Sequence, residues 1–172
     1  YYEASLNYNR TFREKHNITG LLVGVLRENK SGGASSIQTS LPARNIGLSG
    51  RFTYAYDGRY FAEANFGYNG SENFAPKKRF GFFPSAAIGY MISNEAFWEP
   101  ISHIVSVLKF KGSYGIIGND QIGGDVRFIY LGTVANTGSY VYGNYTKTSG
   151  ERVNEVANPN VGWEVSTKQN YG

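Results

Sequence analysis

The sequence predicts an all-β protein made of antiparallel strands, and three observations support this prediction. Glycine accounts for 22 of the 172 residues and aromatic residues for 16%, whereas there are five prolines and no cysteines. Such a composition suits strands and tight turns rather than helices. Apolar and polar residues also alternate with a period of two, and turn-forming residues separate the alternating segments.

The alternation is clearest from Ile46 to Tyr56, where apolar or aromatic side chains alternate with small or polar ones. Because successive side chains of a strand point to opposite faces, this segment has one apolar and one polar face. The Asp57-Gly58 pair that follows is typical of a tight hairpin turn. The same alternation resumes from Tyr60 to Tyr68, so the two segments are expected to form an antiparallel hairpin.

Five further strands are expected from the same pattern. They span roughly Ala4–Phe12, Ile18–Arg27, Phe82–Ser93, Val105–Gly115 and a last segment beginning near Gly162. The expected connections alternate in length along the chain. The short ones are Arg13–Asn17, Asp57–Arg59 and Asn94–Ile104, and the long ones are Asn29–Ala43, Gly70–Gly81 and Ile116–Val161. Short and long connections therefore lie at opposite ends of the predicted sheet.

Two architectures fit these strands. In a soluble β-sandwich the apolar face would pack on a second sheet, whereas in a transmembrane β-barrel it would meet lipid. Unequal connections and strands of 9 to 11 residues are typical of outer-membrane barrels. Aromatic residues also gather toward the strand ends, as in the two girdles of such barrels. The girdle candidates are Tyr54, Tyr56, Tyr60, Phe66, Tyr68, Phe82 and Tyr90. Periodicity, connections and girdles together leave both architectures open.

The composition excludes several other classes of protein. No run of eighteen apolar residues is present, so no transmembrane helix is expected. Mean hydropathy does not test for membrane-spanning strands, because these need an apolar side chain only at every second position. The formal charge of +4 is scattered along the chain, so a nucleic-acid partner is not expected. His16 and His103 are solitary, and no nucleophile elbow or calcium loop occurs. We therefore expect no enzyme active site, metal or cofactor.

Six short motifs occur in a fixed order over nearly the whole chain. They are G-x-x-G-R-x-x-Y-x-Y-D-x-x-Y at Gly47–Tyr60, E-x-x-F-x-x-x-G-S-x-x-F at Glu63–Phe74, R-x-G-x-F-P-S-x-x-x-G-W at Arg79–Tyr90 with tyrosine in place of the tryptophan, the segments Ile92–Phe97 and Leu108–Asn119, and N-P-x-x-x-W-E at Asn158–Glu164. In this order they resemble the C-terminal half of the SusC/RagA group of TonB-dependent outer-membrane transporters.

The resemblance implies a transmembrane β-barrel of 22 strands, with about seven strands in this chain, short periplasmic turns and long extracellular loops. Residues 1–172 would form part of the barrel domain, while the plug domain and signal peptide would lie outside them. The implied function is active import of oligosaccharides or peptides across the outer membrane of a Gram-negative bacterium. TonB would act through an N-terminal region absent from this chain, and a SusD-like surface lipoprotein would form a lid. The alternative is a structural or adhesive barrel without transport.

The barrel interpretation assigns candidate functional residues to two regions, the polar strand faces and the longest loop. A charge facing lipid is costly, so the polar strand faces are expected to line the lumen, either bracing it or taking part in substrate passage. The lumen-facing candidates are Arg51, Glu63, Asn65, Lys109 and Lys111. The longest loop is expected to contact substrate or the lid, with a neighbouring lipoprotein or lipopolysaccharide as the other candidate contact. The loop candidates are Asn119, Asp120, Gln121, Arg127, Tyr130, Tyr140, Tyr142 and Tyr145.

Overall fold

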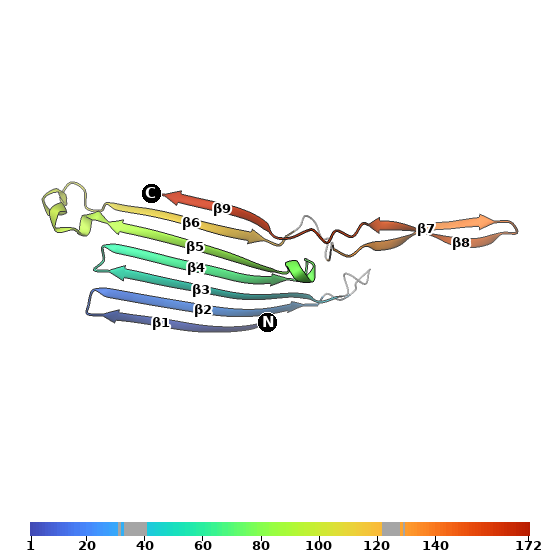
Figure 1. Cartoon of the computed structure of the whole chain (residues 1–172), viewed down its shortest axis with the longest axis horizontal. Helices are drawn as coiled ribbons and strands as arrows, with labels where there is room; N and C mark the ends of the chain where they lie inside the picture. Colours follow the sequence, from blue (N-terminus) through green and yellow to red (C-terminus); the bar gives the residue numbers. More distant parts are fainter. Residues whose placement is uncertain (31, 33–40, 122–127, 129) are drawn as a thin grey trace.

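The computed structural model describes residues 1–30, 32, 41–121, 128 and 130–172, and its main element is one antiparallel sheet of seven strands (Figure 1). These strands are β1 (Tyr2–Phe12), β2 (His16–Asn29), β3 (Ala43–Tyr56), β4 (Tyr60–Ser71), β5 (Phe80–Met91), β6 (Lys109–Asn119) and β9 (Glu164–Tyr171). Each strand pairs with the next in this order. The prediction of an all-β, antiparallel fold is confirmed.

The expected alternation in connection length holds only in part. The β5–β6 connection (residues 92–108), expected to be short, is longer than the β4–β5 connection (residues 72–79) at the opposite end. Tight turns join β1 to β2 and β3 to β4 at the short-turn end of the sheet (Figure 1). Asp57 and Gly58 both have positive φ angles, of 53° and 64°, and the N–H of Arg59 donates to the Tyr56 carbonyl at 2.9 Å. Two central residues with positive φ match the twist of the flanking strands, which is why an Asp-Gly pair suits this hairpin.

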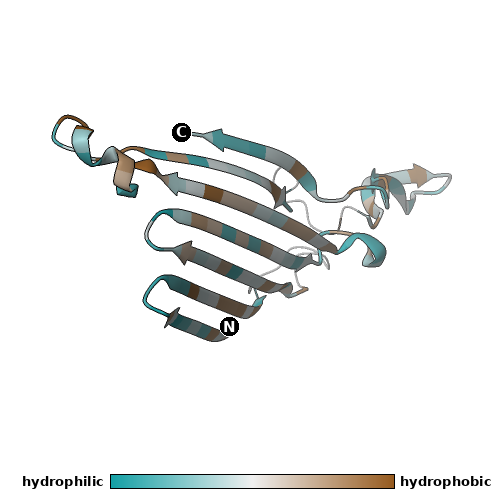
Figure 2. Ribbon diagram, turned by 60° about the vertical axis from the view of Figure 1, so that its left-hand side comes forward, coloured by the Kyte–Doolittle hydropathy of each residue, from teal (hydrophilic) through white to brown (hydrophobic). Residues whose placement is uncertain are grey.

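The register assigns every strand residue to one of two faces, because directly opposite residues of paired strands share a face. Leu22 lies opposite Leu6 and Gly50, whereas its neighbour Val23 lies opposite Ser5 and Ser49. We call the face that carries Leu22 the apolar face and the face that carries Val23 the polar face. Figure 2 shows the apolar and polar residues alternating along the strands.

The described part of the chain forms a single layer, and nothing within it covers the apolar face (Figures 1 and 2). Large side chains on that face stay exposed, including Phe82 at 59% and Ile88 at 70%. Among the described residues the only buried hydrophobic side chains are Phe74 and Phe128, and neither lies in a strand. A soluble β-sandwich would bury this face against a second sheet, so that alternative does not fit the described residues. Nor do they include a helix with the length and apolar character to cross a membrane.

The structure corrects both boundaries of two predicted strands, β5 and β6. Strand β5 starts and ends about two residues earlier than expected and is followed by two 3-10 helices, η2 (Ile92–Asn94) and η3 (Ala96–Ile101). Strand β6 lies four residues later than expected, at Lys109–Asn119 rather than Val105–Gly115, so the connection after it begins at Asp120 rather than Ile116. The Leu108 carbonyl accepts hydrogen bonds from the N–H groups of Ile92 and Ser93, at 3.0 and 3.3 Å, which closes the connection and does not extend the strand.

The longest predicted loop contains a second, two-stranded sheet. A hairpin of β7 (Thr133–Tyr142) and β8 (Thr146–Glu155) projects beyond the long-loop end of the main sheet (Figure 1). Polar residues occupy much of both strands, and the pairing shifts register between Thr133 and Val134 and again between Asn136 and Gly138. These shifts break the period of two, so the alternation that revealed the other strands is missing here.

Candidate functional site

The polar face carries a linked group of three predicted site residues near the middle of the sheet. Arg51 and Asn65 lie directly opposite each other on β3 and β4. The Arg51 guanidinium donates to the Glu63 carboxylate at 2.8 Å, and the Asn65 amide donates to the other oxygen of the same carboxylate at 2.8 Å. An exposed ion pair of this kind contributes about 0–1 kcal/mol, so its main effect is to fix the three side chains in one arrangement.

The two lysines lie on the same face, nearer the short-turn end. Lys111 is opposite Gly89, and the Lys109 ammonium lies 4.8 Å from the centre of the Phe61 ring. A shallow groove of about 260 Å³ lies between β3, β4, β5 and β6 and includes Glu63, Lys109 and Lys111 in its lining. The structure therefore brings all five lumen-facing candidates onto one face and places three of them in one groove.

A group of aromatic side chains occupies the long-loop end of the polar face, and sequence reasoning did not single it out. Phe74 is fully buried at 0% exposure, and its ring centre lies 5.3 Å from that of Trp163. Phe83 contacts the other side of this cluster, with its ring centre 5.0 Å from that of Trp163. The Trp163 indole N–H donates to the Arg79 carbonyl at 3.2 Å. These contacts fasten the β4–β5 connection to the start of β9.

Four of the loop candidates lie close to this aromatic cluster. Asn119 donates to the Glu164 carboxylate at 3.2 Å and accepts from the Gln121 N–H at 3.0 Å. The Asp120 carbonyl accepts from the side chain of Asn73 at 3.2 Å, and the Tyr130 hydroxyl accepts from Arg79 at 3.4 Å. Neighbouring connections are thus joined by hydrogen bonds above the polar face.

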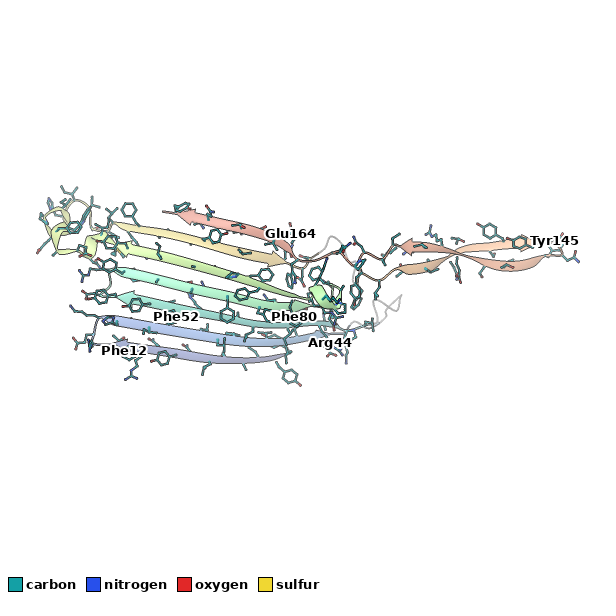
Figure 3. All side chains as sticks on the ribbon, in the orientation of Figure 1. Phe12, Arg44, Phe52, Phe80, Tyr145 and Glu164 are labelled. Atoms are coloured by element: carbon teal, nitrogen blue, oxygen red, sulfur yellow. The ribbon has the colours of Figure 1, made fainter. Side chains whose placement is uncertain are left out.

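The remaining loop candidates are elsewhere. Tyr140 and Tyr142 lie on β7 in the projecting hairpin, and Tyr145 sits at its tip (Figure 3). All three are exposed, and in the described part of the chain this hairpin does not share a site with Asn119 or Asp120. Arg127 lies outside the described residues. The loop candidates in the described residues therefore divide into one group at the long-loop end of the main sheet and one group on the β7–β8 hairpin.

Gly118 on β6 lies against the Phe83 ring of the aromatic cluster. A methyl group added there would overlap the Phe83 ring, whereas one added at Gly24 on the apolar face would meet nothing within 4 Å. Because forced overpacking costs about 1–3 kcal/mol, Gly118→Val is expected to lower the free energy of unfolding by that amount. Urea unfolding of the whole protein in detergent would measure the loss. Gly24→Val is the control, and an equal loss in both variants would contradict the close contact.

An aromatic row crosses the short-turn end of the apolar face. The register places Phe12 opposite His16, His16 opposite Tyr56, Tyr56 opposite Tyr60, Tyr60 opposite Tyr90 and Tyr90 opposite Phe110. The rings of Tyr60 and Tyr90 are stacked, with centres 4.9 Å apart. The hydroxyl of Tyr54, in the next row, is hydrogen-bonded to Nδ1 of His16 at 2.9 Å. Six aromatic rings in one row have the arrangement of an interfacial girdle.

The opposite end of the apolar face is less regular. Tyr68 lies opposite Phe82 and stacks on Phe80, with ring centres 5.2 Å apart, near the long connections. Phe66, another girdle candidate, lies closer to the middle of the sheet, with its ring centre 6.2 Å from that of Phe82. It lies opposite Gly50 and Pro84, and its ring covers the space above Gly50, which has no side chain.

A second group that sequence reasoning missed ties the β5–β6 connection to the aromatic row. Glu95, between η2 and η3, accepts hydrogen bonds from Arg59 at 2.8 Å, from Tyr60 at 3.0 Å and from Tyr90 at 3.1 Å. Arg59 also pairs with Asp57 in the β3–β4 turn. The hydrogen bond from Arg59 lowers the pKa of the Glu95 carboxyl, and the bonds from Tyr60 and Tyr90 act in the same direction.

This lowered pKa predicts a loss of stability in acid. Glu95 stabilises the fold fully at pH values above the ordinary glutamate pKa of about 4.3, and this contribution is lost as the pH falls through the lowered pKa. Glu95→Gln is therefore expected to unfold at a lower temperature than the parent at neutral pH, with the difference shrinking in acid. Thermal unfolding of both proteins across this pH range would test it. A difference that stays constant would show that the Glu95 charge is not responsible.

Comparison with known proteins gives several relatives, although no family model matches the chain. TonB-dependent receptor P39 of Formosa agariphila is 28% identical over 194 residues, which cover 99% of this chain and 18% of that protein. TonB-dependent receptor SusC of Bacteroides thetaiotaomicron is 34% identical over 139 residues, covering 78% of this chain and 14% of that protein.

Solved structures match the fold. The RagAB peptide importer in its closed-closed state superposes with a TM-score of 0.76 and 22% identity, over 98% of this chain and 20% of that one. Its open-open state gives a TM-score of 0.69 with 20% identity, over 99% of this chain and 20% of that one. The chain therefore spans about a fifth or less of each protein that it matches.

A single-layer antiparallel sheet with one exposed apolar face, an aromatic row and unequal connections is a segment of a transmembrane β-barrel. Its two edges, β1 and β9, are open, so closure of the barrel is not seen within the described residues. In sequence the chain corresponds to a segment of TonB-dependent receptors of the SusC type, and in fold to a segment of the RagAB importer. TonB-dependent receptors reside in the outer membrane of Gram-negative bacteria.

Proposed function

We propose that the chain forms part of the wall of an active importer of oligosaccharides or peptides in the bacterial outer membrane. The main support is the combination of its family with the two-faced sheet, which has the chemistry needed to separate lipid from a hydrophilic interior. Among the matched proteins, RagAB is a peptide importer, which favours peptides as one substrate class. A TonB protein would supply the energy through parts of the protein beyond these residues.

Within this proposal the polar face lines the lumen. Arg51, Glu63 and Asn65 form a fixed hydrogen-bonded unit there, and the two lysines lie with Glu63 in the adjoining groove. Charges of both signs next to one another suit a hydrated passage for peptides or sugars, or a contact with a plug that fills the barrel. The same residues would be expensive on the lipid side, at about 2–4 kcal/mol for each basic residue near the bilayer centre.

The long-loop end would then face the cell exterior, and the short-turn end the periplasm. A SusD-like surface lipoprotein is the proposed lid, and the exposed hairpin β7–β8 together with the loops near Asn119 and Asp120 are the proposed contacts for lid or substrate. The exposed tyrosines of the hairpin can stack on a sugar ring or pack against a peptide.

Uptake by cells tests this proposal. Cells with and without the full-length gene would be given labelled peptides and oligosaccharides, with TonB intact or inactivated. We expect at least one substrate class to enter only when both the gene and TonB are present. Equal uptake of every candidate in all cells would contradict import and favour the structural or adhesive barrel. Co-purification of a surface lipoprotein with the full-length protein would test the lid separately.

A role for the polar face has its own test. Glu63→Gln and Lys109→Gln remove charge from the groove, and they are expected to change the uptake rate while the amount of protein in the membrane stays the same. Ser113→Ala, on the same face of β6, is the control because it removes no charge. Unchanged uptake in both charge variants would limit these residues to bracing the barrel wall.

A further inference from the structure

The β5–β6 connection presents a cluster of apolar side chains outward at the short-turn end. It includes η3, and in the segment from Ala96 to Leu108 Phe97 is 65% exposed, Ile104 75% and Val107 66%. Ile101 and Val105 add further exposed apolar surface. We call the five side chains the apolar knob. Such a group of large exposed apolar residues marks a surface that meets another apolar phase.

Internal hydrogen bonds hold the knob in shape. The Trp98 indole N–H donates to the Val105 carbonyl at 3.0 Å, which ties η3 to the segment that returns toward β6. The N–H of Ile104 donates to the Ile101 carbonyl at 2.9 Å, and the Ser102 hydroxyl donates to the Glu99 carbonyl at 2.8 Å. The apolar side chains are therefore displayed by a closed turn rather than by an extended strand.

The knob starts from the apolar face of the sheet. Glu95, immediately before η3, is hydrogen-bonded to Tyr60 and Tyr90 in the aromatic row of that face. At its other end the chain enters β6, where Phe110 is the last member of the same row and is 56% exposed. The knob is thus attached at both ends to the row that marks the boundary of the lipid-facing surface.

Its charge also limits what it can contact. From Ala96 to Leu108 the ionisable side chains are Glu99 and His103, with no lysine or arginine. A nucleic acid or an acidic protein would find no basic groups here, whereas the boundary of a bilayer accommodates exposed aliphatic side chains and a tryptophan whose indole N–H remains hydrogen-bonded.

We propose that the apolar knob inserts into the nearest leaflet of the membrane, where Phe97, Ile101, Ile104 and Val107 lie among acyl chains at the headgroup boundary. This segment acts as a shallow lipid anchor beside the barrel wall. The proposal requires that the apolar face meets lipid, but it does not require import. Import can therefore be confirmed while the anchor is rejected, and the anchor can be confirmed while import is rejected.

Spin labels on the full-length protein test the anchor. A nitroxide would be attached to a single cysteine at position 97 or 104, or at Lys15 in the β1–β2 turn of the same end, whose side chain is 57% exposed. The protein would be reconstituted in vesicles of phosphatidylethanolamine and phosphatidylglycerol. We expect labels at Phe97 and Ile104 to relax faster with oxygen, which concentrates in lipid, and the label at Lys15 to relax faster with a water-soluble nickel complex.

Labels at 97 and 104 that respond to nickel as strongly as the label at Lys15 would overturn the proposal. So would shielding from both agents, because the knob would then be covered by protein. Trp98 provides a second measurement without a label. Brominated phospholipids should quench the fluorescence of the parent more than that of the Trp98→Phe variant, and equal quenching would also overturn the anchor.

Discussion

Replacing Phe74 by alanine is expected to lower the free energy of unfolding by about 3–5 kcal/mol, the usual cost of removing a buried phenylalanine ring. Phe74 is fully buried and packs on Trp163, which in turn packs on Phe83. The ring therefore joins the β4–β5 connection to the start of β9, two segments that are far apart in the sequence. Its removal leaves a cavity between them and loosens the long-loop end.

Urea unfolding of the full-length protein in detergent, with hydrogen exchange of the β4–β5 connection, would measure this loss. Phe82→Ala is the matched control, because Phe82 is 59% exposed on the apolar face and its loss leaves no internal cavity. Similar small losses in both variants would mean that the Phe74 cluster does not hold the loops together.

Replacing Leu22 by lysine is expected to cost about 2–4 kcal/mol, the penalty for a basic residue that faces lipid near the bilayer centre. Leu22 lies opposite Leu6 and Gly50, in a row near the middle of the sheet. A lysine there would have to carry its ammonium group along the apolar face to reach water. The stability of the refolded protein in lipid vesicles, measured by denaturant titration, should fall accordingly.

Val23→Lys is the matched control for this prediction. Val23 is the next residue on β2, but it lies on the polar face opposite Ser5 and Ser49. The same charge should cost much less there, because the ammonium group has serine hydroxyls beside it. Equal losses in the two variants, or a larger loss at Val23, would contradict the assignment of the faces.

The sequence was sufficient for the features that depend on local chemistry. The Asp57-Gly58 pair predicts the observed hairpin because few other residues accept positive φ at low cost. The alternation from Ile46 to Tyr56 correctly separates the two faces, since a period of two does not depend on distant residues. Placing Arg51, Glu63 and Asn65 on one face required only this period, whereas their hydrogen bonds also depend on the β3–β4 register that the Asp57-Gly58 turn sets.

Features that depend on register or on distant contacts were not predictable. His16 looked solitary, yet the pairing of β1, β2 and β3 places it between Phe12 and Tyr56. Glu95 lies in a connection without periodicity, and its partners come from the β3–β4 turn, β4 and β5. Polar residues on both faces concealed the hairpin β7–β8. The row in which Phe66 lies, opposite Gly50 and Pro84, depends on how the strands are staggered, which alternation does not reveal.

Whether the apolar face meets lipid is tested most directly by a cysteine scan along β3 in the full-length protein, with one cysteine at a time from residue 46 to residue 56. Positions of the apolar face, such as Leu48 and Phe52, should respond to a quencher attached to lipid acyl chains. Positions of the polar face, such as Ser49 and Thr53, should instead react with a water-soluble thiol reagent. If cysteines on the apolar face are shielded from lipid by other protein, the assignment of this face to lipid is contradicted.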